Sequence, residues 1–143
     1  MLVRLTYASR ATQGVKGGDI RDILAISRRN NVRFNITGVL CFSHDTFLQC
    51  LEGGRDLVNQ TYNHILGDKR HDRATLLDYR EISSRRYRQW AMAYVSSLDH
   101  NRDLFLKYAE GTEFDPYALS SETVDLFLAE LLEKAVFIDG PPV

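Results

Sequence analysis

A β-hairpin with apolar side chains on both faces is the sequence feature that most constrains this fold. Two strand-like runs, at about residues 35–43 and 46–52, flank a two-residue turn at His44-Asp45. A turn of this length sets Leu40 opposite Gln49 in the paired strands. Because neither face of the hairpin is polar, we expect the sheet that contains it to be covered on both sides.

The elements around the hairpin predict an α+β fold with a ferredoxin-like order, βαββαββ. These elements are a strand at about 2–8, a helix from Asp19 to about Asn31, a helix that follows the strand-breaking Gly53-Gly54 and runs to about Gly67, and strands near 75–83 and 89–96. The order predicts a five-stranded mixed sheet with both of these helices on one face.

Two more helices are expected in the C-terminal third, near 101–109 and from Ser120 or Ser121 onward. Apolar stripes predict which side chains of the later helices face inward. In the helix before Gly67 they are Leu57, Val58, Thr61, Tyr62, Ile65 and Leu66, and in the last helix they are Val124, Phe127, Leu128, Leu131, Leu132 and Ala135. We expect the two C-terminal helices to cover the sheet face opposite the first two. This divides the chain into a core at 1–97 and a helical extension at 98–143, packed on the same domain.

Composition excludes several classes of protein. A net charge of −1 over 143 residues argues against a general nucleic-acid binder. No apolar run is long enough to span a bilayer and no signal peptide is recognisable, so we expect a cytoplasmic protein without membrane contact. The two cysteines, Cys41 and Cys50, are too few for a disulfide framework or a zinc site, and the hairpin register makes them core thiols.

Several polar residues lie on faces that are otherwise apolar. Gln49 shares a strand face with apolar neighbours, Tyr7 lies on the inward face of the first strand, and Ser27 and Asn31 continue the apolar stripe of the first helix. Buried amides must be hydrogen-bonded, so a cluster of this kind between helices and sheet predicts a polar occupant. A planar heterocycle with carbonyls and ring nitrogens fits, and the side chains of Ile23, Ile36 and Phe47 can hold its faces.

The pattern leaves alternatives open at two places. Asn31 taken alone is better explained as a residue near a helix C-terminus than as a ligand contact. His64 and the run from Asp68 to His71 can be a solvated helix end with favourable dipole interactions, or His64, Arg70 and His71 can donate to a carbonyl of the heterocycle.

Taken in order, these residues resemble the BLUF domain, the blue-light sensor that uses a flavin. The resemblance covers about residues 2–96 and rests on the stretches 4–9, 30–31, 35–40, 47–53, 68–71 and 90–92. The two C-terminal helices resemble those of short, stand-alone BLUF proteins. Two departures from the family pattern are His64, where several relatives carry arginine, and Ala91, where many carry serine.

The resemblance implies a role for each site residue. Tyr7 is the implied electron and proton donor to light-excited flavin, and Gln49 the implied switch between that phenol and the flavin. The implied flavin contacts near the switch and the C4 carbonyl are Ser27, Asn30 and Asn31. Arg70 and His71 are the implied contacts near the C2 carbonyl, and Asp68 is the implied contact near the ribityl chain. Trp90 and Met92 are the implied signalling pair, with the choice of which one lies inward left open.

The function expected from this resemblance is a blue-light photoreceptor without enzymatic activity or a metal. FAD is the usual ligand of the family, and FMN is also compatible with the sequence. We see no effector domain in the chain, so we expect the signal to pass through strand five and the C-terminal helices to a separate downstream protein. We also expect a homo-oligomer.

The leading alternative is a small ferredoxin-like enzyme, such as an acylphosphatase or a flavin reductase. The sequence has no Cys-His or Ser-His-Asp grouping at a suitable spacing and no glycine-rich nucleotide loop, which argues against it. An RNA-binding module of similar topology would need a basic surface. A purely structural oligomer would leave Tyr7 and Gln49 as ordinary buried polar residues and would give colourless protein.

Overall fold

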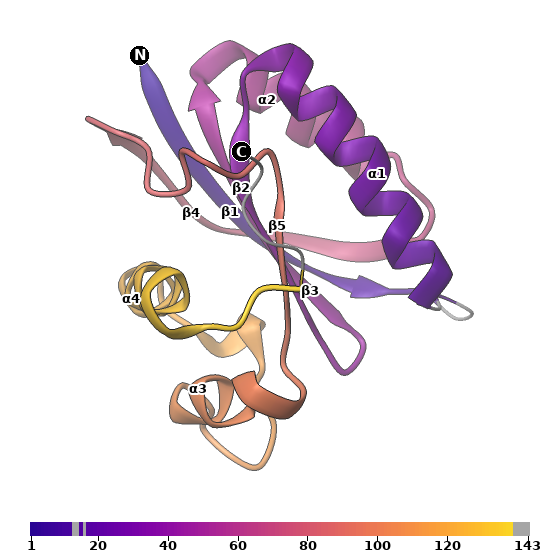
Figure 1. Ribbon diagram of the computed structural model, residues 1–143, viewed down its shortest axis with the longest axis vertical. Helices are drawn as coiled ribbons and strands as arrows, with labels where there is room; N and C mark the ends of the chain where they lie inside the picture. Colours follow the sequence, from indigo (N-terminus) through magenta and orange to yellow (C-terminus); the bar gives the residue numbers. More distant parts are fainter. Residues whose placement is uncertain (13–14, 16, 139–143) are drawn as a thin grey trace.

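The predicted hairpin forms the middle of the sheet in this computed structural model, which describes residues 1–12, 15 and 17–138 (Figure 1). Strand β2 (Thr37–Ser43) pairs antiparallel with β3 (Thr46–Gly54). Leu40 lies opposite Gln49, so the predicted register is confirmed.

The other three strands complete a mixed sheet in the order β4-β1-β3-β2-β5. Strand β1 (Leu2–Ala11) lies antiparallel between β3 and β4 (His71–Ile82). The short β5 (Ala93–Ser96) runs parallel to β2 at the opposite edge. The sheet therefore has the predicted α+β, ferredoxin-like architecture.

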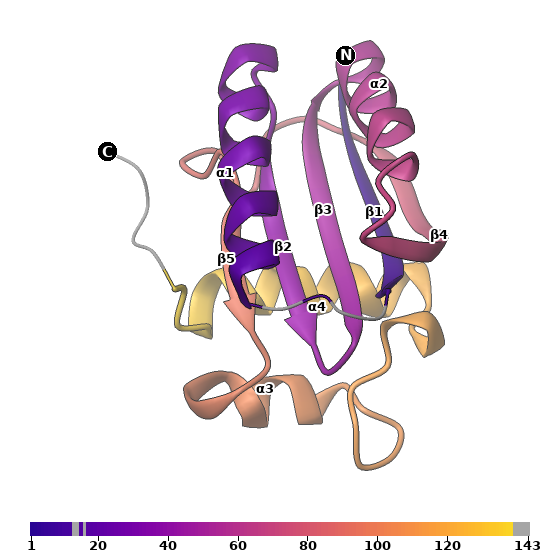
Figure 2. The same ribbon diagram turned by 90° about the vertical axis from the view of Figure 1, so that its right-hand side faces the viewer.

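Helices cover both faces of the sheet, as the apolar hairpin predicted (Figure 2). Helices α1 (Gly17–Phe34) and α2 (Arg55–Leu66) lie on one face. Helices α3 (Arg102–Lys107) and α4 (Ser121–Lys134) lie on the other, with short 3-10 turns at Asp99–Asn101 and Pro116–Ala118. In the described part of the chain, no helix is both long and apolar enough to cross a bilayer.

Side chains along β3 point alternately to the two faces of the sheet, so the interior contains two cores. Phe47 and Leu51 pack with Ile20, Leu24 and Val58 of the first two helices. On the opposite face the core is built from Val39, Cys41, Leu48 and Cys50 of the hairpin with Phe105, Phe127, Leu128 and Leu131 of the C-terminal helices. Burial raises the pKa of the Cys50 thiol to about 12 and raises that of Cys41 as well, which fits core thiols.

Several predicted boundaries were wrong. Strand β3 continues through Gly53-Gly54, β4 begins at His71 rather than near residue 75, and α1 runs on to Phe34. Leu57 and Leu66 of α2, predicted to face inward, are exposed.

The fifth strand differs most from its prediction. It starts at Ala93, so Trp90 and Met92 lie in the segment before it and not within it. The Trp90 amide donates to the Tyr87 carbonyl over 3.0 Å, which turns the chain there. An extended strand from residue 89 is incompatible with this turn.

Candidate cofactor-binding site

A cavity of about 420 Å³ lies between the sheet and the α1–α2 layer, a size typical of small-molecule sites. Its walls come from β1, β2, β3, α1, α2, the turn between α2 and β4, and the first residue of β4. The lining residues are Tyr7, Ser9, Ile23, Ile26, Ser27, Asn30, Asn31, Leu40, Phe47, Gln49, Leu51, Thr61, His64, Ile65, Gly67, Asp68, Arg70 and His71.

Tyr7 and Gln49 form a hydrogen-bonded pair on the sheet wall of this cavity. They lie directly opposite each other in the β1–β3 ladder, so their side chains share one face. The Tyr7 hydroxyl donates to Oε1 of Gln49, and both side chains are buried. Burial, followed by the nearby Tyr62 and Asp68, raises the pKa of the Tyr7 phenol well above its usual value. The phenol therefore keeps its proton throughout the physiological pH range.

The other end of the Gln49 amide contacts the segment before β5. Its Nε2 donates to the sulfur of Met92 at 3.5 Å, and Met92 is buried on the cavity side of the sheet. Trp90 belongs to the core on the opposite face, with its ring 4.6 Å from that of Phe137. Of the two residues predicted to carry the signal, Met92 is thus the one on the cavity side of the sheet.

The α1 wall also contacts this segment. The buried Asn31 donates through Nδ2 to the Ala91 carbonyl over 2.7 Å. The Nε of Arg28 donates to the Met92 carbonyl over 3.0 Å. The backbone on either side of Met92 is therefore fixed by side chains of α1.

The turn between α2 and β4 supplies the charged rim of the cavity. Arg70 pairs with Asp68 at 2.6 Å, and its backbone amide donates to Oδ1 of Asp68 over 2.9 Å. The hydrogen bond from Arg70 holds the pKa of the Asp68 carboxyl below its usual range. Nε2 of His71 lies 2.7 Å from the Ile65 carbonyl oxygen, which fixes the ring at the cavity wall. The rim thus keeps one carboxylate and one guanidinium in a fixed orientation.

All the predicted contact residues except Ile36 line this one cavity. Ile36 is buried on the same side of the sheet, but its side chain lies beside Gly53, at the far end of β3 from the cavity. Sequence reasoning missed Ser9, Ile26, Leu40, Leu51, Thr61, Ile65 and Gly67. Strand alternation offered a signal for Ser9, because it lies two residues after Tyr7 and faces the same way.

The lining fits a planar, hydrogen-bonding heterocycle. Among the described residues, the Ser9 hydroxyl is one of three buried side-chain oxygens with no hydrogen-bond partner, and it lies on the cavity wall. A buried hydroxyl without a partner is costly, so this site calls for a polar ligand atom. Amide groups of Asn30, Asn31 and Gln49 can pair with the edge of a flavin, while Ile23 and Phe47 offer apolar surface to its ring.

Comparisons with known proteins identify the family of this chain. A family model for BLUF, "Sensors of blue-light using FAD", matches residues 2–93. The "Blue light- and temperature-regulated antirepressor BluF" of Escherichia coli (strain K12) is 30% identical over an alignment of 147 positions, which covers 99% of this chain and 36% of BluF. The "Photoactivated adenylate cyclase subunit beta" of Euglena longa is 33% identical over 92 residues, 64% of this chain. This chain spans 11% of that cyclase subunit.

Solved structures resemble this chain over nearly its whole length. BlsA in its photo-activated state is 33% identical with a TM-score of 0.85, covering 100% of this chain and 99% of BlsA. BlrB, a BLUF protein in its dark state, is 30% identical with a TM-score of 0.72, covering 90% of this chain and 96% of BlrB. The family match, these relatives and the cavity described above lead to one assignment: the chain belongs to the BLUF family of blue-light sensors.

Proposed function

We propose that this chain is a blue-light photoreceptor in which the Gln49 amide is the switch. The observation that carries this proposal is the hydrogen bond from the Tyr7 hydroxyl to Oε1 of Gln49, made at the wall of a cavity of suitable size. The ligand we propose is a flavin, with FAD as the first candidate because of the family description and FMN as the alternative.

The cavity residues divide into groups that hold the ligand from different sides. We assign Asn30, Asn31 and Ser27 of α1 to one edge of the ring, and Arg70, His71 and His64 to the opposite edge. Asp68, at the rim, is assigned to the polar chain that continues from the ring. Apolar contacts from Ile23 and Phe47 exclude water from the ring faces and strengthen the hydrogen bonds at its edge.

When bound, a flavin supplies the absorption of blue light and a strong oxidant in its excited state. The Tyr7 phenol lines the cavity and can release an electron together with a proton. Its raised pKa means that the electron does not leave from a phenolate. The hydrogen bond directs the proton to Oε1 of Gln49, which is the acceptor already in place.

The electron and a proton then return to Tyr7, and the lasting change is in the Gln49 amide, by rotation or tautomerisation. Either change exchanges donor and acceptor positions, so the partners Tyr7 and Met92 both receive a different group. Hydrogen bonds of this kind contribute about 0.5–1.5 kcal/mol each, net, which is small enough for two arrangements to be close in free energy. Such a pair of states can be populated by light and revert in the dark.

The proposed function is tested by the absorption spectrum of the purified protein. We expect yellow protein whose flavin band shifts to longer wavelength under blue light and returns in the dark. Protein that stays colourless after incubation with FAD or FMN would contradict the proposed ligand. Yellow protein with a spectrum unchanged by blue light would contradict the proposed switch.

We further propose that the signal reaches a separate protein through the C-terminal helices. Met92 contacts Gln49, and five residues earlier the Tyr87 hydroxyl donates to the Leu128 carbonyl of α4 over 2.6 Å. A change at Gln49 therefore has a short physical connection to α4.

Amide hydrogen exchange in the dark and under blue light tests this route. We expect exchange rates to differ between the two states within residues 89–135. Identical exchange across that region, in protein that shows the spectral shift, would rule out output through α4.

A further inference from the structure

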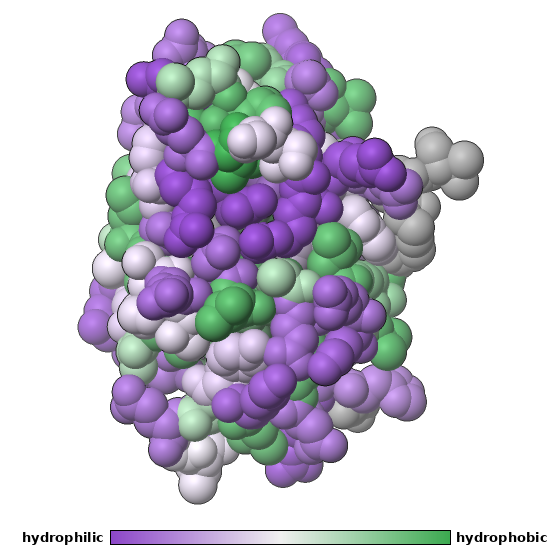
Figure 3. All heavy atoms as spheres, turned by 90° about the vertical axis from the view of Figure 1, so that its left-hand side faces the viewer, coloured by the Kyte–Doolittle hydropathy of each residue, from purple (hydrophilic) through white to green (hydrophobic). Residues whose placement is uncertain are grey.

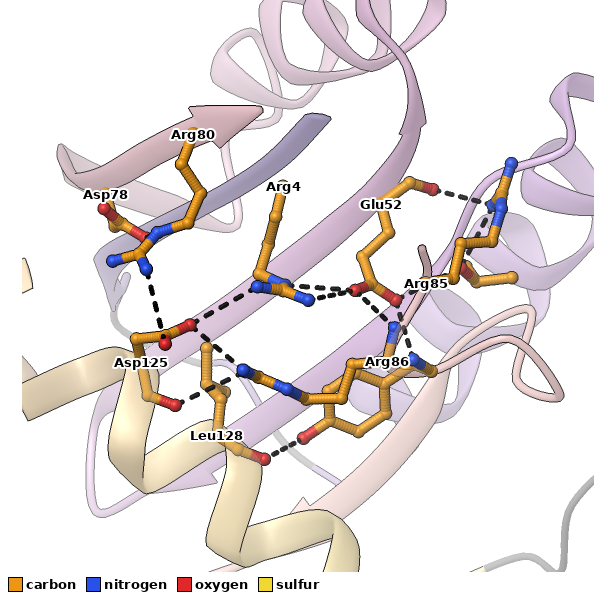
Figure 4. A network of polar contacts seen from close by, with 10 residues as sticks. Arg4, Glu52, Asp78, Arg80, Arg85, Arg86, Asp125 and Leu128 are labelled. Atoms are coloured by element: carbon orange, nitrogen blue, oxygen red, sulfur yellow. Dashed lines mark hydrogen bonds and ion pairs between the residues drawn. The ribbon is translucent and has the colours of Figure 1, made fainter. Parts of the chain in front are cut away.

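Glu52 is a buried carboxylate whose oxygens are used to hold the segment before β5. It lies three residues after Gln49 in β3 and is 0% exposed. Oε2 accepts from the Arg86 amide at 2.9 Å and Oε1 from the Tyr87 amide at 2.7 Å. Oε2 also pairs with the Arg4 guanidinium at 3.0 Å (Figure 4). The carboxylate thus fixes two consecutive backbone amides.

These amides belong to the β4–β5 segment, residues 83–92, which connects Ile82 of β4 to Ala93 of β5. The segment contains no helix or strand, so contacts with the rest of the fold decide its path. Glu52 holds the backbone of its first half, where the Arg85 side chain also donates to the Asn35 carbonyl and the Tyr87 hydroxyl to the Leu128 carbonyl. Its second half is held by Asn31 and Arg28, and by the Gly38 amide, which donates to the Trp90 carbonyl at 3.0 Å.

Strand β3 therefore contacts this segment twice, from opposite faces. Gln49 meets the sulfur of Met92 on the cavity side, while Glu52 holds residues 86 and 87 on the α4 side. The position of Met92 against Gln49 depends on where the segment begins its turn. The Glu52 carboxylate holds the two backbone amides at that point.

The outer members of the same network contribute less to holding the β4–β5 segment. Asp125 of α4 lies 3.4 Å from Arg4, 3.2 Å from Arg86 and 3.4 Å from Arg80. Its side chain is 20% exposed and that of Arg80 39%. Hydrophilic residues gather across the middle of the face that looks to the left in Figure 1 (Figure 3). Solvent screens such pairs, whereas a buried carboxylate must keep its partners.

We propose that Glu52 is a positioning residue for the photoswitch, which sets Met92 against Gln49 by holding the amides of residues 86 and 87. This inference rests on the proposed function. A glutamine at position 52 has the same shape but carries one NH2 group in place of an oxygen, and that group cannot accept from the backbone amide of Arg86 or Tyr87. The β4–β5 segment then loosens, the contact between Met92 and Gln49 weakens, and the switched amide returns over a lower barrier.

The test compares Glu52→Gln with Asp125→Asn, a matched loss of one carboxylate from the same network. Asp125→Asn disturbs the α4 side but leaves both backbone amides bound. Three quantities are measured for each variant: the thermal midpoint, the rate of dark recovery, and the 13C-methyl resonance of Met92. That resonance is readily assigned because the chain has only two methionines.

For Glu52→Gln we expect a displaced or broadened Met92 resonance in the dark and a recovery about tenfold faster than wild type. For Asp125→Asn we expect a lower thermal midpoint, an unchanged Met92 resonance and recovery within about twofold of wild type. A Met92 resonance that stays in place in Glu52→Gln would overturn the proposal. So would equal effects of both variants on recovery, because that outcome indicates a loss of stability alone.

A second variant covers the case in which Glu52→Gln does not fold, because it leaves the Arg4 charge buried without its carboxylate. The double variant Arg4→Met/Glu52→Gln removes both charges and is judged by the same criteria. If the wild type shows no light-induced shift, the proposed function fails, and the Met92 resonance alone then decides the positioning role.

Discussion

Replacing Tyr7 with phenylalanine is expected to abolish the light-induced spectral shift while the flavin stays bound. The substitution removes the hydroxyl that donates to Oε1 of Gln49, and with it both the electron and the proton that the switch requires. The ring remains in the same packed position, so the cavity keeps its shape. The measurement is the absorption difference between dark and blue-illuminated protein at matched flavin occupancy.

Tyr62→Phe is the matched control for this prediction. The Tyr62 ring centroid lies 5.1 Å from that of Tyr7, so the variant removes a neighbouring phenol from the same aromatic pair. We expect it to keep a reversible shift. A long-lived shifted state in Tyr7→Phe would show that another group is the donor. Loss of the shift in Tyr62→Phe alone would move the donor role from Tyr7 to Tyr62.

Gly38→Ala is expected to destabilise the fold by at least about 3 kcal/mol. A Cβ atom at this position would lie 1.9 Å from the Cys50 carbonyl oxygen, which is backbone and cannot rotate away. The same residue donates its amide to the Trp90 carbonyl, so a displaced β2 also pulls on the β4–β5 segment. Because domains of this size are stable by only about 5–15 kcal/mol, we expect a strongly lowered unfolding midpoint and poor flavin retention.

Gly54→Ala provides the comparison, since an added Cβ there meets no atom within 4 Å. We expect its unfolding midpoint in denaturant to lie close to that of the wild type, because surface changes away from special features cost little. Equal stability of the two variants would mean that β2 and β3 separate readily at Gly38. The close approach of the two strands would then be less rigid than the structure shows.

The hairpin could be predicted in detail because short-range rules fix it. Turn length sets the pairing of Leu40 with Gln49, and apolar residues on both faces require two covering layers. The fifth strand could not be predicted in the same way. Trp90 has a side chain that favours strands, but hydrogen bonds from Asn31 and Arg28, and one from the Tyr87 amide to Glu52, impose another path. Those bonds join residues far apart in sequence.

The inward faces of the helices could also be predicted only in part. A stripe drawn through α2 from spacing alone included Leu57 and Leu66, although only Val58 is fully buried. Leu57 and Leu66 lie at the edges of the stripe, where the width of the contact with the sheet decides exposure. Ile36 faces the correct side of the sheet but lies too far along it to reach the cavity. Whether a residue reaches the cavity depends on where the helices cross its strand, and local sequence patterns do not contain that information.

The site itself followed from polar residues on apolar faces, and Tyr7 with Gln49 is the best example. Each residue is unusual alone, and the β1–β3 ladder then places them directly opposite each other. The buried carboxylate of Glu52 was not found in this way. Two of its partners are backbone amides, which cannot be recognised from the pattern of side chains along the sequence.

The stacking of Trp90 on Phe137 gives this chain an internal optical reporter. Trp90 is its only tryptophan, and its indole lies across the sheet from the cavity, in the layer with α3 and α4. Ultraviolet-excited emission from the indole therefore monitors the far layer, while visible absorption monitors the cavity. Recording both signals in one sample would show separately when each layer changes after a single flash.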